Sequence, residues 1–309
     1  MSDAIGVILR ELQYLLFSSA GIVIGVLAMY YILSREKLAN ALSKLGDWIT
    51  KLSGLPGQCS LPFVASLFSP STGSSMLVTM YSEGKLSRRE LYIASLINTF
   101  PALLSHLRTL VPVLLSAMGL YGLIYLGLLI LMGVTQMAMF AALGRVILKG
   151  KTTEIQMQRD AWKVRSTLNL RRVARLLLKM ISTMVITTLA FTILDVFGFG
   201  ELINLNLSKA LSFLDPYAIG IVVAYIVSDV AAFAVAGTLL NNGYSGTVIL
   251  EWLLIGYAMS SLFRGLRHNA PYYLGVYGPK DGLLILLIST STRTSLALSF
   301  LGVLWLVQG

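Results

Sequence analysis

The sequence predicts an all-α polytopic membrane protein that consists of two inverted repeats, and three observations lead to this prediction. Of the 309 residues, 56% are hydrophobic and only 12% are charged, whereas soluble proteins carry roughly 25% charged residues. Apolar stretches long enough to cross a bilayer recur from end to end,. The cations, which give the chain a net charge of +10, are unevenly distributed. These observations exclude an ordinary soluble globule and a disordered chain.

The two halves of the chain align with each other without gaps at an offset of 159 positions. At this offset a glycine, an arginine and a proline coincide in both halves: Gly84 with Gly243, Arg108 with Arg267, and Pro112 with Pro271. Matched leucines are expected by chance in this composition, but this shared spacing is not. We therefore expect a first repeat over residues 1–148, a basic cytoplasmic linker over 149–170 and a second repeat over 171–309.

Each repeat is expected to contain a spanning helix, an amphipathic helix, a broken apolar stretch and two further long spanning helices, in that order. In the first half these five elements are Gln13–Leu33, Glu36–Leu52, Leu61–Tyr81, Arg89–Met118 and Tyr121–Leu148. In the second half they are Val173–Val196, Glu201–Leu214, Tyr217–Leu240, Val248–Tyr277 and Gly282–Val307.

Each of these elements has its own sequence signal. The first and the fifth are apolar and long enough to cross a bilayer. The second has apolar residues near helical spacing, which predicts a helix along the membrane interface: Leu38, Leu42, Leu45, Trp48 and Leu52,. The third is broken by proline and glycine within Ser69–Gly73,. The fourth is long and carries the arginine and proline that coincide in the two halves.

The positions of the cations predict the topology. Lysines and arginines both precede and follow the first broken stretch, so a re-entrant hairpin would keep both groups in the cytoplasm. Each half then crosses the membrane three times, and the second half must be inverted. Its equivalents have indeed lost their cations: Lys85, Arg88 and Arg89 correspond to Tyr244, Thr247 and Val248. The prediction is a multi-pass protein of the cell (plasma) membrane, with both termini outside and the central loop cytoplasmic. If the broken stretches are full spans, the chain has eight spans in a parallel repeat instead.

The first break is rich in hydroxyl groups. Backbone N–H groups freed at the start of a helix, with hydroxyl donors beside them, suit an anion or another polar group. In the alternative interpretation the hydroxyls satisfy the backbone and allow close helix packing. The substrate-binding candidates of this segment are Ser69, Ser71, Thr72, Ser74 and Ser75.

A few ionisable residues lie inside predicted spans, where they are functional candidates. Asp229 falls at the second break, next to Ser228, and is a candidate site for a coupling H⁺ or Na⁺; the alternative is a structural pair with an arginine. Arg293 lies mid-span in a hydroxyl-rich stretch and could meet Asp229 or an anionic substrate. The remaining substrate-binding candidates of these helices are Asn98, Arg108, Ser228, Arg267 and Arg293.

No metal site, cofactor or enzyme activity is expected. The chain has one cysteine, Cys59, and two histidines, which disfavour a Cys-based or His-rich metal cluster,. The intramembrane enzyme hypothesis finds no His/Asp dyad and no metal-ligand spacing. The basic segment around 145–179 is interpreted as a cytoplasmic loop that touches anionic lipid headgroups rather than as a nucleic-acid site.

The segment Leu55-Pro56-Gly57 leading into Ser69–Ser75, followed by Gly84 and the Asn98 region, resembles the nucleoside recognition or Gate domain family. That family includes the membrane region of the ferrous iron transporter B and the spore maturation membrane proteins. The resemblance covers most of the chain and implies a role in transport or gating. The chain has no GTPase domain and no cluster of Cys or Met ligands in its broken stretches, which argues against ferrous iron.

The leading hypothesis is a secondary transporter or flippase for an anionic substrate, by alternating access around two opposed hairpins. The substrate would carry a phosphate or carboxylate and could be lipid-linked, because the embedded arginines outnumber the embedded acid Asp229,. The alternatives are an intramembrane lipid-modifying enzyme and a nucleoside or ion transporter of the Gate family. The expected partners are membrane lipids, the substrate and a coupling H⁺ or Na⁺. A homodimer is left open, and nucleic acid is not expected.

Overall fold

The described part of the chain is helical throughout. The computed structural model describes residues 36–148, 215–265 and 269–308, together with scattered positions between 13 and 31 and between 174 and 193. These residues contain no strand. Three helices are long and apolar enough to cross a membrane: Arg88–Met118, Leu120–Ile147 and Pro279–Leu306. The predicted class, an all-α membrane protein, is therefore confirmed.

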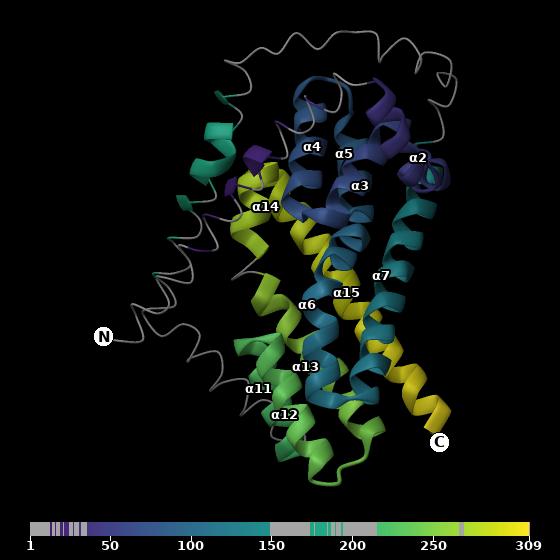
Figure 1. Ribbon diagram of the computed structural model, residues 1–309, viewed down its shortest axis with the longest axis vertical. Helices are drawn as coiled ribbons and strands as arrows, with labels where there is room; N and C mark the ends of the chain where they lie inside the picture. The colour runs from purple at the N-terminus through teal and green to yellow at the C-terminus, as the bar shows by residue number, and fades with distance from the viewer. Residues whose placement is uncertain are drawn as a thin grey trace.

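The described elements follow the predicted order (Figure 1). In the first half they are α2 (Glu36–Ser53), the 3-10 turn η1 (Gly57–Cys59), α3 (Ser60–Phe68), α4 (Pro70–Ser82), α5 (Arg88–Ile97), α6 (Thr99–Met118) and α7 (Leu120–Ile147). In the second half they are α11 (Pro216–Val227), α12 (Asp229–Asn241), α13 (Gly246–Arg264), α14 (Ala270–Tyr277) and α15 (Pro279–Gln308). The predicted amphipathic helix Glu201–Leu214, the linker 149–170 and most of the two first spanning helices lie outside the described residues.

Both predicted breaks are present, and each consists of one extended residue. Ser69 (φ −153°, ψ 114°) ends α3 and caps α4, where its Oγ accepts the N–H of Thr72 at 3.4 Å. Ser228 (φ −166°, ψ 152°) does the same between α11 and α12, accepting the N–H of Ala231 at 3.0 Å. A serine cap satisfies a backbone donor that a helix start leaves without a partner. Ser69 and Ser228 are 159 positions apart, the offset of the sequence repeat.

The turns obey the same offset. Gly84 and Gly243 have positive φ values of 75° and 87°, and Gly119 and Gly278 have values of 56° and 84°. Glycine adopts this left-handed region without the steric cost that a side chain would impose. The breaks and the glycine turns of the two halves are therefore 159 positions apart, the same offset at which the residue types match.

The predicted fourth element of the first half is one stretch of spanning length, Arg88–Met118, that is interrupted at a single residue. Asn98 separates α5 from α6, because Pro101 has no N–H to donate to the carbonyl of Ile97. In the counterpart Val248–Tyr277 the structure describes α13 (Gly246–Arg264) and α14 (Ala270–Tyr277), while residues 266–268 between them lie outside the described residues. The long fourth element expected in the first half is therefore confirmed, with an interruption at Asn98 that the hydropathy pattern did not predict.

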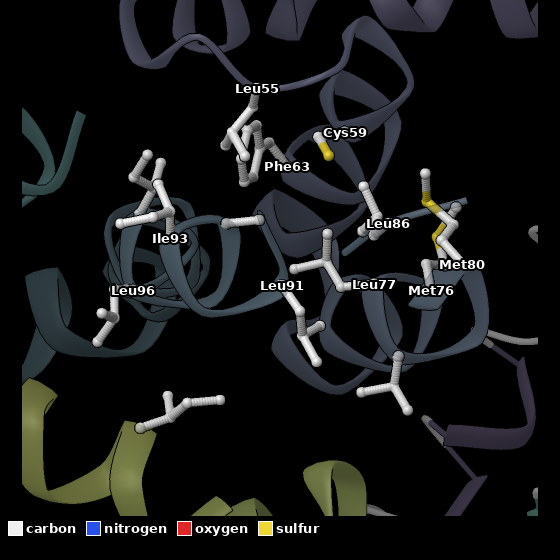
Figure 2. Close-up of a cluster of buried hydrophobic side chains, with 14 of the residues drawn as sticks. Leu55, Cys59, Phe63, Met76, Leu77, Met80, Leu86, Leu91, Ile93 and Leu96 are labelled. Atoms are coloured by element: carbon white, nitrogen blue, oxygen red, sulfur yellow. The ribbon is translucent and has the colours of Figure 1, made fainter. Parts of the chain in front are cut away.

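Two hydrophobic cores hold the halves together. In the first core, side chains of α3, α4 and α5 such as Phe63, Leu77 and Leu91 converge (Figure 2). This core also contains Tyr277 and Ile285 of the second half. The second core is likewise built mainly from one half of the chain and includes residues of the other half. It is built around α11, α12 and α13 and also contains Met118 and Leu126 of the first half. These two residues are 159 positions before Tyr277 and Ile285, the residues of the second half in the first core. Each core thus combines the broken helix pair of one half with a glycine turn of the other.

The two broken pairs occupy opposite halves of the structure, α3–α4 in the upper part of Figure 1 and α11–α12 in the lower part. α7 and α15 run between them. The end of α7 lies against the end of α2, where a Cβ on Gly144 would come within 2.7 Å of the Ser53 carbonyl oxygen. The turn at the start of α7 lies against α12, because Gly237 packs on the backbone of Ala117. The long helices therefore link two ends of different composition.

The end with α2, which we term the basic end, contains seven of the described cations. It is formed by α2, the last turn of α7 and the first turns of α5 and α15, with Lys44, Lys51, Lys85, Arg88, Arg89, Arg145 and Lys280. The opposite end, termed the aromatic end, is formed around the turns at Gly119 and Gly243. Its aromatic residues are Tyr121, Tyr217, Tyr244, Trp252 and Trp305. The stretches 109–144 and 216–247, which build much of it, contain no Lys or Arg.

Candidate functional site

A cavity of about 470 Å³ lies between helices of both halves. It is lined from α6, α7, α11, α12, α13 and α15, and its polar lining includes Thr99, His106, Gln136, Asp229, Ser261 and Arg293. A volume of this size is in the range of pockets that bind small molecules. Arg293 lies near the middle of α15, Pro279–Gln308, roughly 21–23 Å from each end at 1.5 Å per residue. The cavity is therefore at the depth of the bilayer midplane if α15 spans the membrane.

Arg293 is held at the cavity wall by an amide. Its Nε donates to Oε1 of Gln136 at 3.3 Å, and Nε2 of Gln136 donates to Oγ of Ser289 at 3.4 Å. Gln136 is only 2% exposed, so the amide is fixed by packing. Among the described residues Arg293 forms no ion pair. Arg293 thus lines the cavity with its Nε in a hydrogen bond to Gln136.

Asp229 lines the same cavity as Arg293, as one sequence interpretation expected. It is the first residue of α12, directly after the cap Ser228. A carboxylate in the first turn of a helix is stabilised by the helix dipole. Asp229 and Arg293 form no direct ion pair with each other. The structure brings the two groups to one cavity without joining them.

His106 is a cavity residue that the sequence did not single out. It lines the cavity from α6, and the positive charges of Arg108 and Arg293 are close enough to act on it. Arg108 itself is exposed and does not line the cavity. Among the described residues, the charged groups at or near the cavity are Arg293, Arg108 and Asp229.

One wall of the cavity is aromatic. Tyr225, Phe233 and Tyr257 line it, and the ring centroids of Tyr225 lie 5.8 Å from Phe233 and 6.3 Å from Tyr257 in edge-to-face geometry. The hydroxyl groups of Tyr225 and the fully buried Tyr125 are hydrogen-bonded to each other. These contacts hold the residues just before the second break in place.

The first break forms a separate polar cluster. Oγ of Ser69 is 3.0 Å from Oγ of Ser71, and Oγ of Ser75 donates to the carbonyl of Thr72 at 2.9 Å. Nδ2 of Asn98 donates to Oγ of Ser74 at 3.4 Å. The cluster is joined to the other half by the hydroxyl of Tyr272, which donates to the carbonyl oxygen of Pro70 at 3.0 Å. None of these residues lines the cavity.

The sequence-predicted site thus falls into two parts. The cavity gathers Asp229 and Arg293, with the cap Ser228 directly before Asp229. The first break gathers the five hydroxyl candidates and Asn98. Arg267 lies outside the described residues. The residues that the sequence missed, Gln136 and His106, carried a usable signal, because each is a strongly polar side chain within an apolar span.

The described helices and the polar cavity halfway along them define a class, the polytopic helical membrane proteins with a buried solute-sized site. Residues 16–121 match the Gate family, whose description is nucleoside recognition. The chain is 30% identical to the uncharacterized protein MJ1556 of Methanocaldococcus jannaschii over 304 residues, 95% of each chain. The chain belongs to the Gate family, which is associated with transporters rather than enzymes.

Two further proteins of the same archaeon are similar over most of their length. The uncharacterized protein MJ0871 is 28% identical, over 86% of this chain and 85% of that protein. The uncharacterized protein MJ0880 is 25% identical, over 86% of this chain and 88% of that protein. No solved structure matches the chain.

Proposed function

We propose that the chain is a secondary transporter for a small phosphate- or carboxylate-bearing substrate that binds in the central cavity. The observation that carries this proposal is Arg293, halfway along α15, bound by Gln136 and without an ion pair among the described residues. An arginine at this depth is costly unless it is paired or solvated. A bound anion supplies that partner, and the guanidinium fits phosphate and carboxylate groups in a bidentate manner.

The charges around the cavity support an anion over a cation. Arg293 and the nearby Arg108 outnumber Asp229. In this scheme Asp229, at the start of α12, takes the coupling H⁺ or Na⁺, so that the driving ion and the substrate share one cavity. Binding of the ion to the carboxylate strengthens the positive potential felt by the substrate.

We further infer that the two broken pairs are re-entrant hairpins in an inverted repeat. α3 and α4 have 9 and 13 residues, and α11 and α12 have 12 and 13, so each is at most roughly 20 Å long, shorter than the roughly 30 Å of a hydrocarbon core. The helices of each pair also pack against one another. The positive-inside rule then assigns the basic end to the cytoplasm and the aromatic end to the outside.

Alternating access follows from this arrangement. The two hairpins approach the bilayer from opposite sides, and a rocking motion would open the cavity to one side at a time. The hydroxyls of the first break, Ser69–Ser75, and Asn98 would bind the substrate in the state in which the first hairpin faces it. Arg108 and Arg267 hold equivalent places in the two halves and would attract the anion at the two entrances.

A nucleoside or nucleotide is the second candidate substrate. Tyr257, the half-buried ring of the aromatic wall, offers a face for a planar base,, and the description of the family, nucleoside recognition, also favours such a substrate. The two candidates overlap in a nucleoside monophosphate, which carries both a base and a phosphate.

The experiment is a binding screen on the purified chain in detergent, read as a shift in the thermal unfolding midpoint. The probes are inorganic phosphate, glutamate, glycerol 3-phosphate, AMP, adenosine and dioleoyl phosphatidic acid. We expect at least one anionic probe to stabilise the protein and Arg293→Gln to abolish the shift. Arg89→Gln, which removes an exposed cation at the basic end, is the control and should keep it.

The probes also separate the alternatives. Stabilisation by AMP but not by phosphate or adenosine supports the nucleotide, and stabilisation by phosphatidic acid alone supports a lipid-linked substrate. Adenosine acting as well as AMP, with no effect of Arg293→Gln, would show that the cavity does not select an anion.

A further inference from the structure

The surface of α2 is divided into three faces along its length. At about 100° per residue, Lys44 and Lys51 fall within about 20° of each other, and Trp48, Leu52 and Leu45 follow within about 100° of Lys44. The opposite side of the helix is buried: Gly46, Ile49, Thr50 and Ser53. α2 therefore has a protein face, an apolar outer face and a lysine edge beside the apolar face.

The apolar outer face has no partner among the described residues. Leu45, Trp48 and Leu52 are 63%, 52% and 42% exposed. Tryptophan is typical of the membrane–water interface, because its ring is apolar and its N–H is polar. An exposed stripe of this kind, next to lysines that can extend toward water, fits a helix that lies in the plane of a lipid surface.

The cations beside this face are available to an external anion. Among the described residues Lys44, Lys51 and Arg145 form no ion pair, whereas Lys85 pairs with Glu83 and Arg88 with Asp281 at the same end. The nearest acid on α2, Asp47, forms none either.

The C-terminal end of α2 lies against the last turn of α7, which carries Arg145. Arg145 is exposed in the last turn of α7, beside Gly54, which follows α2. α2 also packs on α3, the first helix of the broken pair. A ligand bound at the lysine edge would therefore bind a helix that packs both on the end of a spanning helix and on the first helix of the broken pair.

We propose that the outer face of α2, with Lys44, Lys51 and Arg145, is a docking surface for anionic phospholipid headgroups of the leaflet on the basic side. The acyl chains lie against Leu45, Trp48 and Leu52, and the phosphates bind the two lysines and the arginine. This surface is separate from the central cavity, so the proposal does not depend on which substrate is transported. Its role is to anchor α2, and with it α3, in the plane of the leaflet.

The test is a native mass spectrometry titration of the full chain with dioleoyl phosphatidylglycerol and, separately, with dioleoyl phosphatidylcholine. We expect the first bound phosphatidylglycerol to be held more tightly than phosphatidylcholine. Each cation near a membrane surface contributes about fivefold to the affinity for anionic lipid. The double variant Lys44→Gln/Lys51→Gln should therefore weaken phosphatidylglycerol binding about 25-fold, and Arg145→Gln about fivefold.

The matched control is Lys280→Gln, which removes one exposed lysine of the basic end from α15 instead of α2 and should leave the first binding event unchanged. Equal affinities for the two lipids would overturn the proposal, as would equal losses in Lys280→Gln and in Lys44→Gln. Displacement of phosphatidylglycerol by millimolar inorganic phosphate would show a site for free anions and would contradict lipid docking.

A second measurement does not depend on the charges. Leu45→Cys in a Cys59→Ala background, labelled with bimane and reconstituted in phosphatidylglycerol-containing vesicles, reports the surroundings of the apolar face. Quenching by a lipid that carries a nitroxide near its headgroup supports the docking surface. Quenching by aqueous iodide without quenching by the lipid overturns it, because the face would then lie in water.

Discussion

Gly73 is the residue at which the two helices of the first broken pair come closest. A Cβ at this position would lie 2.5 Å from the carbonyl oxygen of Pro62 and would overlap Oγ of Ser66. Because a backbone carbonyl cannot move aside without shifting α3, Gly73→Ala should destabilise the protein by about 1–3 kcal/mol. The unfolding midpoint in detergent measures this effect.

Gly127 provides the control for this substitution. It lies on an exposed side of α7, and nothing would be within 4 Å of a Cβ there. Gly127→Ala should leave stability unchanged or raise it slightly, because alanine favours a helix over glycine. Equal unfolding midpoints for the two variants would contradict the close packing of α3 and α4.

Gln136 tests how Arg293 is held. Gln136→Glu keeps the size of the side chain but places a carboxylate 3–4 Å from the guanidinium, an estimate from the present contact of about 3.3 Å. The new ion pair would compete with a bound anion, so we expect at least a tenfold loss in affinity for the anionic probe, about 1.4 kcal/mol, with the fold retained. The affinity is measured by titration calorimetry, and a variant that binds as tightly as the wild type would show that Arg293 does not contact the ligand.

At the scale of the elements, the caps of the two breaks are the features most open to test. Ser228→Ala removes the side chain that accepts the N–H of Ala231 and should cost about 1 kcal/mol of stability. Ser228→Asn retains an acceptor and should restore most of it. A loss that Ser228→Asn does not rescue would mean that the serine acts through packing and not as a cap.

Most of the helices and both breaks could be predicted from the sequence, but their packing around the cavity could not. Hydropathy and helix breakers predicted α2, both broken pairs and α7, because these features depend on residues close in the chain. The interruption at Asn98 was not predicted, because the apolar run continues through it without a change in hydropathy. Its cause is Pro101, which has no backbone N–H to donate,. The meeting of Asp229, Arg293, Gln136 and His106 depends on the packing of four helices, which periodicity does not specify.

At the scale of the whole molecule, the distribution of charge predicts the orientation. The only cysteine, Cys59, is buried, so single cysteines can be introduced in a Cys59→Ala background. In intact cells a membrane-impermeant maleimide should label Asn242→Cys, near the turn at Gly243, but should label Lys51→Cys only after permeabilisation. Labelling of both from the same side would contradict the assignment of the two ends to opposite sides of the membrane.

The distribution of charge separates the cations that set the orientation of the molecule from the cation at the cavity. Among the residues that the structure describes, seven cations gather at the basic end, where the positive-inside rule would account for them. Arg293 lies halfway along a spanning helix and forms no ion pair among the described residues. The two cores fix it at the cavity by holding α7 and α15 against the broken pairs of both halves.

The most direct test of this account is the uptake of the best-binding anionic probe into proteoliposomes under a proton or Na⁺ gradient. We expect saturable uptake by the wild type and its loss in Arg293→Gln, with the variant folded and inserted to the same extent. Saturable uptake that is unchanged in Arg293→Gln would contradict the central claim that this arginine binds the transported anion.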